Sequence, residues 1–383
     1  MDWLTGSKQG EAKRLIAQLA DPGRRDHAQQ ELIRLGPESL PLLIEALQTQ
    51  DLNLLPIYQQ ILARIPSAIP TLIKTLATAH PLLRGRAAEV LGMSMDKSAI
   101  PALLEALKGE FFTVRSRAAL ALANIGDIQT IPGILPLLKD REDEVRMAGC
   151  TALGKFRAPS TFDEIANVLL DDSKIEVRQA AARALGDTKH PAAVPFLMEA
   201  LHDSFWWYER EQAASDLLNA IEKMESAVVD PLLNALEDRE GTVRKFAASL
   251  LGRLGDPRAI EPLGMALYDL HHEVGKAAAE SLAKFGSKGM DPLLEALHHP
   301  EAGIRGNVVQ VLGKIQDSRV APGLIDMLHD PERTIQKQAL QSLGGLQDPR
   351  ASEALQTIAS NRADREMSAL AKNIIANNQR QSN

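Results

Sequence analysis

The chain has 383 residues, 45% hydrophobic and 24% charged, and this balance excludes an intrinsically disordered or collagen-like protein. No apolar run approaches the roughly 20 residues of a membrane-spanning helix, and the start, Met1 to Gly6, lacks the basic and apolar stretches of a secretory signal. A single cysteine, Cys150, excludes an internal disulfide framework and a cysteine-rich zinc site. From these three observations together, we expect a cytoplasmic protein with no membrane partner.

The formal net charge of −7 arises entirely in residues 191–383, which carry 20 basic and 27 acidic side chains. A nucleic-acid-binding protein normally needs a basic face, because it gains affinity by releasing counterions from the phosphates. Neither half of this chain is net basic. The charge pattern therefore predicts that nucleic acid is not the partner.

A helical pattern recurs along the chain at intervals of 29 to 34 residues. A leucine stands seven residues after every anchor position, and the residue three after the anchor is alanine or glycine in nine of the eleven units. At about 100° per residue these positions share one face, so each anchor lies in an amphipathic helix whose small residues let neighbouring helices approach closely. The anchor is arginine in eight units, and the anchors are residues 25, 55, 84, 115, 146, 178, 210, 244, 275, 305 and 336.

Another helix precedes each of these, as in residues 99–107, and its final leucine usually stands eight residues before the anchor. Proline recurs in its first turn, where the missing N–H is harmless and the fixed φ is already helical. Each unit is therefore a helical hairpin, and because such a hairpin cannot bury its apolar face alone, the hairpins must stack. The prediction is an all-α fold, an α-solenoid coiled as a right-handed superhelix of about twelve hairpins.

In chain order, we expect an N-terminal cap over about residues 1–20, regular hairpins, an irregular repeat over about 191–227, and a degenerate cap repeat over about 349–378. The irregular repeat has nine residues from Leu201 to its anchor instead of eight, and 26 from Arg210 to Leu236 where other units mostly have 23. No linker interrupts the pattern. Residues 1–383 are therefore predicted to form a single solenoid.

The stretch from Val243 to Ile260, VRKFAASLLGRLGDPRAI, resembles the HEAT-like repeat of the phycobilisome (PBS) lyase type. The resemblance covers nearly the whole chain and implies a bacterial-type solenoid of HEAT-like hairpins. Scaffolds, chromophore lyases and chaperones, and metal hydroxylases all contain such repeats, so the resemblance does not select one function. It also implies that Arg at the anchor and Asp six residues before it tie adjacent layers together. Such aspartates are Asp140, Asp172, Asp238, Asp269 and Asp330.

Two activities of HEAT-like relatives are rejected on this sequence. The deoxyhypusine hydroxylase places His-Glu pairs just after the anchor in four repeats, whereas the one His-Glu pair here, His272-Glu273, precedes its anchor, Gly275. The relative that excises alkylated DNA bases relies on a basic groove, which the charge pattern does not provide.

Histidines gather at the ends of the preceding helices, or in the following turns, of three consecutive units. Imidazole binds zinc-like ions and titrates near neutrality, so a metal-binding or pH-sensitive edge is one interpretation. Equivalent positions in adjacent layers lie on the order of 10 Å apart, which is loose for shared coordination and favours solvated turn residues. The weak metal candidates are His271, His272, His298, His299 and His329.

Cations recur nine residues after the anchor, opposed by one acidic residue, Asp187. They can complement the dipole at a helix C-terminus, or form a broken basic column on the inner, concave surface for an acidic segment of a partner. The column five residues after the anchor is polar and contains no nucleophile–base arrangement, and Cys150 is expected in the core. The basic column comprises Arg34, Arg64, Lys155, Arg253, Lys284 and Lys314.

The irregular repeat carries four consecutive aromatic residues in its turn. Four neighbouring rings cannot all point inward, although some can fill gaps between layers. Exposed aromatic clusters are typical of binding sites, which predicts a partner or planar-ligand site with two arginines at its edge. A matching turn earlier in the chain has two phenylalanines. The candidate residues are Phe205, Trp206, Trp207, Tyr208, Arg178 and Arg210, with Phe111 and Phe112 in the matching turn.

These observations favour a non-catalytic scaffold that binds another protein through its concave face or its aromatic turn edge, with no cofactor. Two alternatives stay open. The resemblance implies a bilin lyase or chromophore chaperone, which would hold a tetrapyrrole against the aromatic rings with arginine near its propionates. The histidine edge would instead imply a metal-binding HEAT protein.

Overall fold

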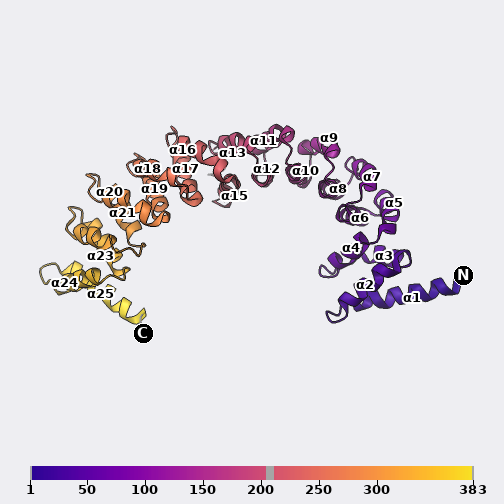
Figure 1. Ribbon diagram of the computed structural model, residues 1–383, viewed down its shortest axis with the longest axis horizontal. Helices are drawn as coiled ribbons and strands as arrows, with labels where there is room; N and C mark the ends of the chain where they lie inside the picture. The colour runs from indigo at the N-terminus through magenta and orange to yellow at the C-terminus, as the bar shows by residue number, and fades with distance from the viewer. Residues whose placement is uncertain (1, 204–210, 382–383) are drawn as a thin grey trace. The chain divides into compact units, whose positions relative to one another are not determined.

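The computed structural model describes residues 2–203 and 211–381, and within these ranges it contains helices and turns but no strand (Figure 1). None of the helices in these ranges is both long enough and apolar enough to cross a membrane. The contacts divide the chain into two compact units, Met1–Lys223 (unit 1) and Met224–Asn383 (unit 2). The boundary falls inside the predicted irregular repeat. A single solenoid across that boundary stays a prediction.

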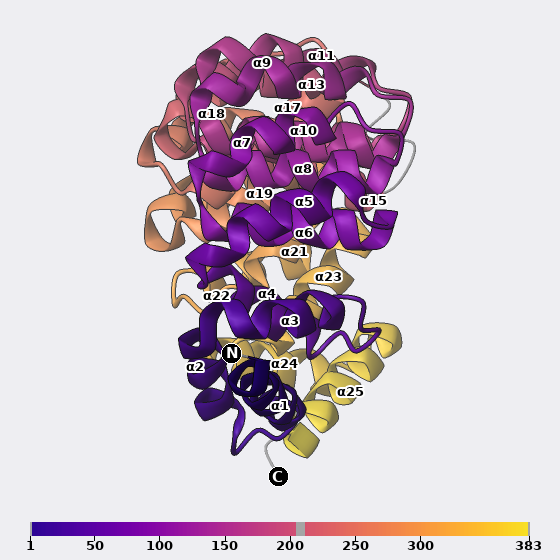
Figure 2. The same ribbon diagram turned by 90° about the vertical axis from the view of Figure 1, so that its right-hand side faces the viewer.

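Each hairpin consists of a first helix and a second helix in chain order, and unit 1 is a series of such hairpins. The second helices pack side by side, α6 on α8 and α8 on α10 (Figure 1, Figure 2). The first helices are α1 (Asp2–Gln18), α3 (Leu40–Ala46), α5 (Ile69–Thr78), α7 (Ile100–Ala106), α9 (Ile131–Ile134), α11 (Phe162–Asp171) and α13 (Val194–Ala200). The second helices are α2 (Arg25–Leu35), α4 (Leu55–Ala63), α6 (Pro81–Ser94), α8 (Phe112–Ile125), α10 (Asp143–Phe156), α12 (Ile175–Thr188) and α15 (Glu211–Glu222).

Unit 2 repeats this order, and its last hairpin covers the predicted degenerate cap. With unit 1, the described residues form twelve hairpins, so the predicted all-α solenoid is confirmed. The first helices are α16 (Val229–Ala235), α18 (Ile260–Ala266), α20 (Met290–Ala296), α22 (Val320–Asp326) and α24 (Pro349–Ser360). The second helices are α17 (Gly241–Leu254), α19 (His272–Lys284), α21 (Ala302–Leu312), α23 (Arg333–Gly344) and α25 (Arg365–Gln381).

The core of each unit lies between its first and second helices. The leucines predicted seven residues after each anchor, from Leu32 to Leu343, are all fully buried. Each contributes about 1.5–3 kcal/mol relative to an exposed side chain. In α11 the residue in the core is Leu169, while Leu170, the residue eight before the anchor, is only partly buried.

Hydrogen bonds in the turns that connect one hairpin to the next fix the start of the following first helix. In several of them an aspartate side chain accepts a hydrogen bond from the backbone N–H two residues later, as from Ser98 to Asp96 (2.8 Å) and from Arg258 to Asp256 (2.9 Å). A short 3₁₀ segment follows and leads into the first helix. This local bonding satisfies backbone groups that would otherwise be unpaired at the start of the helix.

Candidate functional site

The anchor arginines join adjacent layers, as the resemblance implies. Arg305 donates from Nε and Nη2 to the two carboxylate oxygens of Asp330 in the next layer, at 2.7 and 2.9 Å. Both side chains are almost fully buried, at 9% and 1% exposed. Such bidentate geometry is strong and directional. The same arrangement joins Arg115 to Asp140, Arg146 to Asp172, and Arg244 to Asp269.

In each Arg–Asp pair, both side chains also make hydrogen bonds to backbone groups in neighbouring turns. Arg305 Nη1 donates to the carbonyl oxygens of His299 and Pro300, and the backbone N–H of Glu332 donates to Asp330 Oδ1 at 2.8 Å. The Arg305 side chain lowers the pKa of Asp330, and the Arg244 side chain does the same for Asp269. These charges are structural, as predicted, and they are not available to a ligand.

Acid is therefore expected to weaken the fold through these carboxylates. A carboxyl whose pKa is lowered by folding stabilises the native state above its unfolded pKa of about 3.9 and loses that contribution as the pH falls through its folded pKa. The urea midpoint, followed by far-UV circular dichroism, should change little from about pH 7 to 5 and fall below about pH 4. The Asp330→Asn variant should show a shallower fall, and an acid profile identical to that of the wild type would contradict this assignment.

Two layers without an anchor arginine receive a side-chain contact from the next layer. Where Leu55 replaces arginine, Arg86 of α6 reaches back and donates to the carbonyl oxygens of Leu47 and Thr49. Burial lowers the pKa of Arg86, because the charged form loses hydration. Where Gly275 replaces arginine, the corresponding residue of α21 is Asn307, whose Nδ2 lies 3.5 Å from the carbonyl oxygen of His272. Sequence reasoning identified the two positions without arginine but missed these contacts of Arg86 and Asn307.

The turns within hairpins form an edge that we call the turn edge. Phe111 and Phe112 are each 38% exposed there, and the Arg84 guanidinium lies 6.0 Å from the Phe111 ring centre. The same Arg84 lines a cavity of about 320 Å³, whose other walls come mainly from α5 and α7 and include the apolar Leu76 as well as the charged Glu105 and Lys108. An exposed leucine, Leu270, occupies a turn of this edge in unit 2 and is 99% exposed. Leu52 does the same in unit 1.

The predicted aromatic cluster of Phe205, Trp206, Trp207 and Tyr208, together with Arg210, lies outside the described residues. Arg178, the other predicted edge cation, is 8% exposed. Its Nε donates to the carbonyl oxygen of Asp172 and its Nη1 to Asp203. The structure thus places Arg178 in an Arg–Asp pair between layers.

The five candidate histidines are spread along turns of unit 2. His299 packs its ring against Tyr268, with centres 5.0 Å apart, and its Nδ1 accepts the backbone N–H of Glu301. The others are exposed: His271, His272, His298 and His329. Among the residues that the structure describes, no three His, Cys, Asp or Glu side chains are grouped so that they could hold a metal ion.

All six side chains of the basic column are exposed; four lie on second helices, and Arg64 and Lys314 lie in the turns just after α4 and α21. We call the surface that the second helices form the second-helix face. Arg34 pairs with Glu31 of its own helix, and Lys155 donates to Asn124 of the preceding layer. Lys284 and Lys314 make no ion pair with any described residue. Asp187, the acidic exception, pairs with Lys223.

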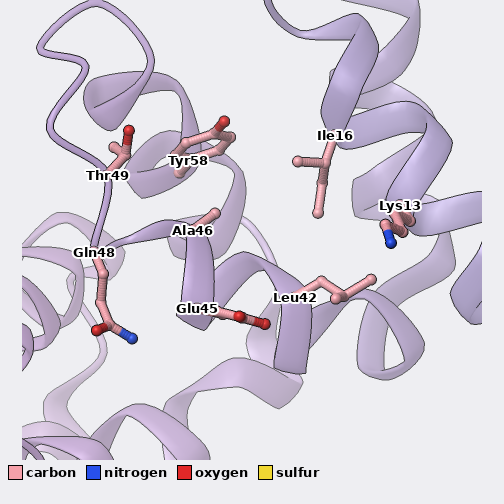
Figure 3. A pocket seen from close by; sticks show the side chains of 8 residues that line it. All are labelled: Lys13, Ile16, Leu42, Glu45, Ala46, Gln48, Thr49 and Tyr58. Carbon is pink, nitrogen blue, oxygen red and sulfur yellow. The ribbon is translucent and has the colours of Figure 1, made fainter.

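Two further cavities were not anticipated from the sequence. One, of about 490 Å³, lies in the first two hairpins, with Lys13 and Ile16 of α1 on one side and Leu42 of α3 and Tyr58 of α4 on the other (Figure 3). The other lies on the second-helix face of unit 2, against α19, α21 and α23, where Gly303 and Gly306 leave space. The pair of glycines on one helix was the available sequence signal.

Cys150 is fully buried, as expected from its position four residues after an anchor. Burial, followed by the nearby Asp172 carboxylate, raises the pKa of its thiol to about 12. The thiolate needed for nucleophilic attack is therefore scarce at neutral pH.

Structural relatives share the solenoid fold. The karyopherin Kap121p bound to Pho4p superposes with a TM-score of 0.56 at 12% identity, over 96% of this chain and 50% of that chain. Kap121p bound to the extreme C-terminus of the protein phosphatase Cdc14p gives a TM-score of 0.55 at 13% identity, over 90% of this chain and 46% of that one. This chain thus corresponds to about half the length of those karyopherins, and the similarity shows the fold alone.

No curated protein matches the sequence. The family model for HEAT repeats matches residues 69–149, 131–217, 229–290 and 290–374, which together exceed half of the chain. The match is to HEAT repeats in general, without the finer phycobilisome-lyase type. With the stacked hairpins and their Arg–Asp pairs, it shows that this protein belongs to the HEAT-repeat family.

Proposed function

We propose that this protein is a non-catalytic scaffold that binds another protein through its turn edge and its second-helix face. The observation that carries this proposal is the exposure of Phe111 and Phe112 at the turn edge, near a partly apolar cavity lined by Arg84, the residue whose guanidinium lies against the Phe111 ring. Exposed apolar groups next to a concave surface are typical of protein-binding sites, and aromatic side chains supply much of the affinity there.

The repeated architecture supports the same proposal. Stacked hairpins form long surfaces on which a partner makes many weak contacts along several layers. The two karyopherin structures described above are complexes, one with Pho4p and one with the extreme C-terminus of Cdc14p. The exposed Leu52 and Leu270 extend the turn edge within units 1 and 2, respectively. The predicted aromatic cluster at residues 205–208 belongs to this proposal because it occupies an equivalent turn of the sequence.

The two alternatives receive less support. A bilin lyase or chromophore chaperone would use arginine beside a tetrapyrrole propionate, but the Arg178 side chain is buried and bonded between layers. A metal-binding role would draw on the histidines, yet in the described parts of units 1 and 2 no group of three ligands exists. We therefore retain the protein scaffold as the proposed function.

The proposal predicts that aromatic residues of the turn edge are required to capture a partner. The tagged wild type and the variants Phe111→Ala/Phe112→Ala and Trp206→Ala/Trp207→Ala would be used for affinity capture from the native host, with quantitative mass spectrometry of the eluates. We expect a protein that the wild type retains and at least one variant loses several-fold, because truncating an aromatic anchor removes about 2 kcal/mol or more of binding energy.

The matched control is Met265→Ala, which removes a side chain that is 71% exposed on α18 instead of at the turn edge. It should retain the partner. Identical protein lists for all variants would contradict a binding role of the turn edge. Visible absorbance in the wild-type eluate, lost in the Trp206→Ala/Trp207→Ala variant, would support the tetrapyrrole alternative instead.

A further inference from the structure

One anchor arginine of unit 1 has no aspartate to pair with. Arg84 of α6 corresponds to Arg115 and Arg146 in the next two layers, whose carboxylate partners stand 25 and 26 residues later in the sequence. The residue 25 after Arg84 is Gly109. Arg84 Nε donates to the carbonyl oxygen of Leu76 at 2.7 Å, whereas its Nη1 and Nη2 donate to no described residue. Two nitrogens of this guanidinium are therefore available to an acceptor.

Gly109 occupies the backbone position of the missing aspartate. Its N–H donates to the carbonyl oxygen three residues earlier at 3.2 Å, as the N–H of Asp140 does at 3.1 Å. Its own carbonyl oxygen accepts from Arg115 Nη1 at 3.0 Å, and that of Asp140 accepts from Arg146 Nη1 at 2.9 Å. A Cβ atom at Gly109 would lie 3.8 Å from Arg84 Nη2. This layer therefore has the backbone of the Arg–Asp pair and lacks the carboxylate.

The missing carboxylate leaves a second donor without an acceptor. Asp140 Oδ1 accepts the backbone N–H of Glu142, the residue directly before α10, and the same contact recurs in later layers. The equivalent N–H belongs to Phe111, which directly precedes α8 and donates no hydrogen bond to a described residue. Anions are favoured at such a helix N-terminus. One carboxylate could therefore accept from both Arg84 and Phe111, as Asp140 accepts from both of its donors.

A cavity leads to these donors. Arg84 and Gly109 both line the cavity of about 320 Å³ at the turn edge. Its one acidic lining residue, Glu105, is already paired with Lys108 at 3.0 Å. Glu110, the other acidic residue of this turn, is exposed and makes no ion pair with a described residue. No described carboxylate therefore takes the place of the missing aspartate.

We propose that an aspartate side chain of a partner protein fills this position, which we call the Arg84 site and define by Arg84, Gly109 and the N–H of Phe111. The inference rests on the proposed scaffold function. The carboxylate accepts from the Arg84 guanidinium and from the Phe111 N–H, and such charge-assisted hydrogen bonds are the strong ones. Apolar residues on either side of the aspartate contact the exposed rings of Phe111 and Phe112 and the apolar wall at Leu76. Aspartate is the expected residue because aspartate fills the same position in the other layers.

The first test uses two fluorescein-labelled, C-terminally amidated peptides of about eight residues, with a central aspartate or asparagine between leucines. Binding to the full chain is measured by fluorescence anisotropy at low salt. The wild type should bind the aspartate peptide about tenfold more tightly, and Arg84→Gln should remove this preference, because the charge-assisted hydrogen bonds are lost. Arg25→Gln is the matched control: Arg25 is also an anchor whose Nε donates to a carbonyl oxygen, that of Leu19, but it does not line the cavity. It should keep the preference.

The second test places the missing carboxylate in the chain itself. Gly109→Asp should abolish binding of the aspartate peptide, and its urea midpoint, followed by far-UV circular dichroism, should exceed that of Gly109→Asn, which has the same shape without the charge. Adding Arg84→Gln to Gly109→Asp should remove this difference. A Cβ atom at this glycine would lie 3.2 Å from the carbonyl oxygen of Ala106, and this cost is common to both substitutions, so their comparison reports the carboxylate.

Equal binding of the two peptides, binding of neither, or a preference that folded Arg84→Gln retains would overturn the inference. A midpoint for Gly109→Asp at or below that of Gly109→Asn would do the same. Tighter binding of a peptide whose one carboxylate is its C-terminus would overturn the assignment to a side chain. Failure of the scaffold proposal is a different result. A partner that Phe111→Ala/Phe112→Ala loses and folded Gly109→Asp retains would leave the scaffold role standing while removing the Arg84 site from it.

Discussion

Replacing Asp330 with alanine is expected to lower the free energy of unfolding by about 3–5 kcal/mol, because it leaves the Arg305 guanidinium buried without its carboxylate partner. Desolvation of an unpaired charge costs far more than the loss of an exposed ion pair. The measurement is urea denaturation followed by far-UV circular dichroism. Because repeat proteins often unfold in segments, the midpoint of the transition that reports unit 2 is the quantity to compare.

The matched control is Asp230→Ala, which removes the partner of Arg258 in the same unit. Those two side chains are 75% and 53% exposed, so water replaces the lost contact and the midpoint should barely change. The double variant Arg305→Met/Asp330→Leu should recover part of the loss, because it removes both buried charges. It cannot recover all of it, since the carbonyl oxygens of His299 and Pro300 lose the Arg305 donor. Equal midpoints for Asp330→Ala and Asp230→Ala would contradict the structural role of the buried pair.

The repeating features of this fold could be predicted because each depends on a short, regular spacing. The leucine seven residues after the anchor falls on the buried face in each of the eleven units that have an anchor, whatever the neighbouring layers contain. The Arg–Asp pairs also repeat, since Arg305 and Asp330 are separated by 25 residues and Arg115 and Asp140 by the same number. Local periodicity and one fixed inter-layer step were sufficient for both.

The cavity of unit 2 that α19, α21 and α23 line could not be predicted in this way, because it depends on how helices from three layers are placed around the glycines of α21. Gly303 alone is an unremarkable helix residue, and Asn307 reads as one more polar position in α21. Only the positions of α19 and α23 on either side of α21 show that the glycine leaves a cavity, which Lys276 and Gln338 also line. Arg86 was missed for a related reason: its acceptors are carbonyl oxygens of the preceding layer, which have no sequence signature.

Close approach of the second helices makes Gly252 of α17 the second sensitive position. A Cβ atom there would lie 2.7 Å from the backbone Cα of Ser281 in α19, and 2.4 Å from its Cβ. Ser281 is itself fixed, since its hydroxyl donates to the carbonyl oxygen of Ala248 at 2.9 Å. No rotamer change can relieve a clash with backbone, so the two helices must move apart and loosen the buried face that they share.

We therefore expect Gly252→Val to lower the free energy of unfolding by about 1–3 kcal/mol, whereas the usual effect of removing glycine from a helix is favourable by about 1 kcal/mol. Gly264→Ala in α18 is the matched control, because its Cβ would lie 3.4 Å from Pro292, an ordinary packing distance, and it should raise the urea midpoint. Ser281→Gly combined with Gly252→Ala should recover only part of the loss, because the new methyl group still lies too close to the α19 backbone. A rise in midpoint for Gly252→Val would mean that α17 and α19 have room to separate. The second-helix face would then adjust to a partner, instead of being held in one shape by the packing of its own layers.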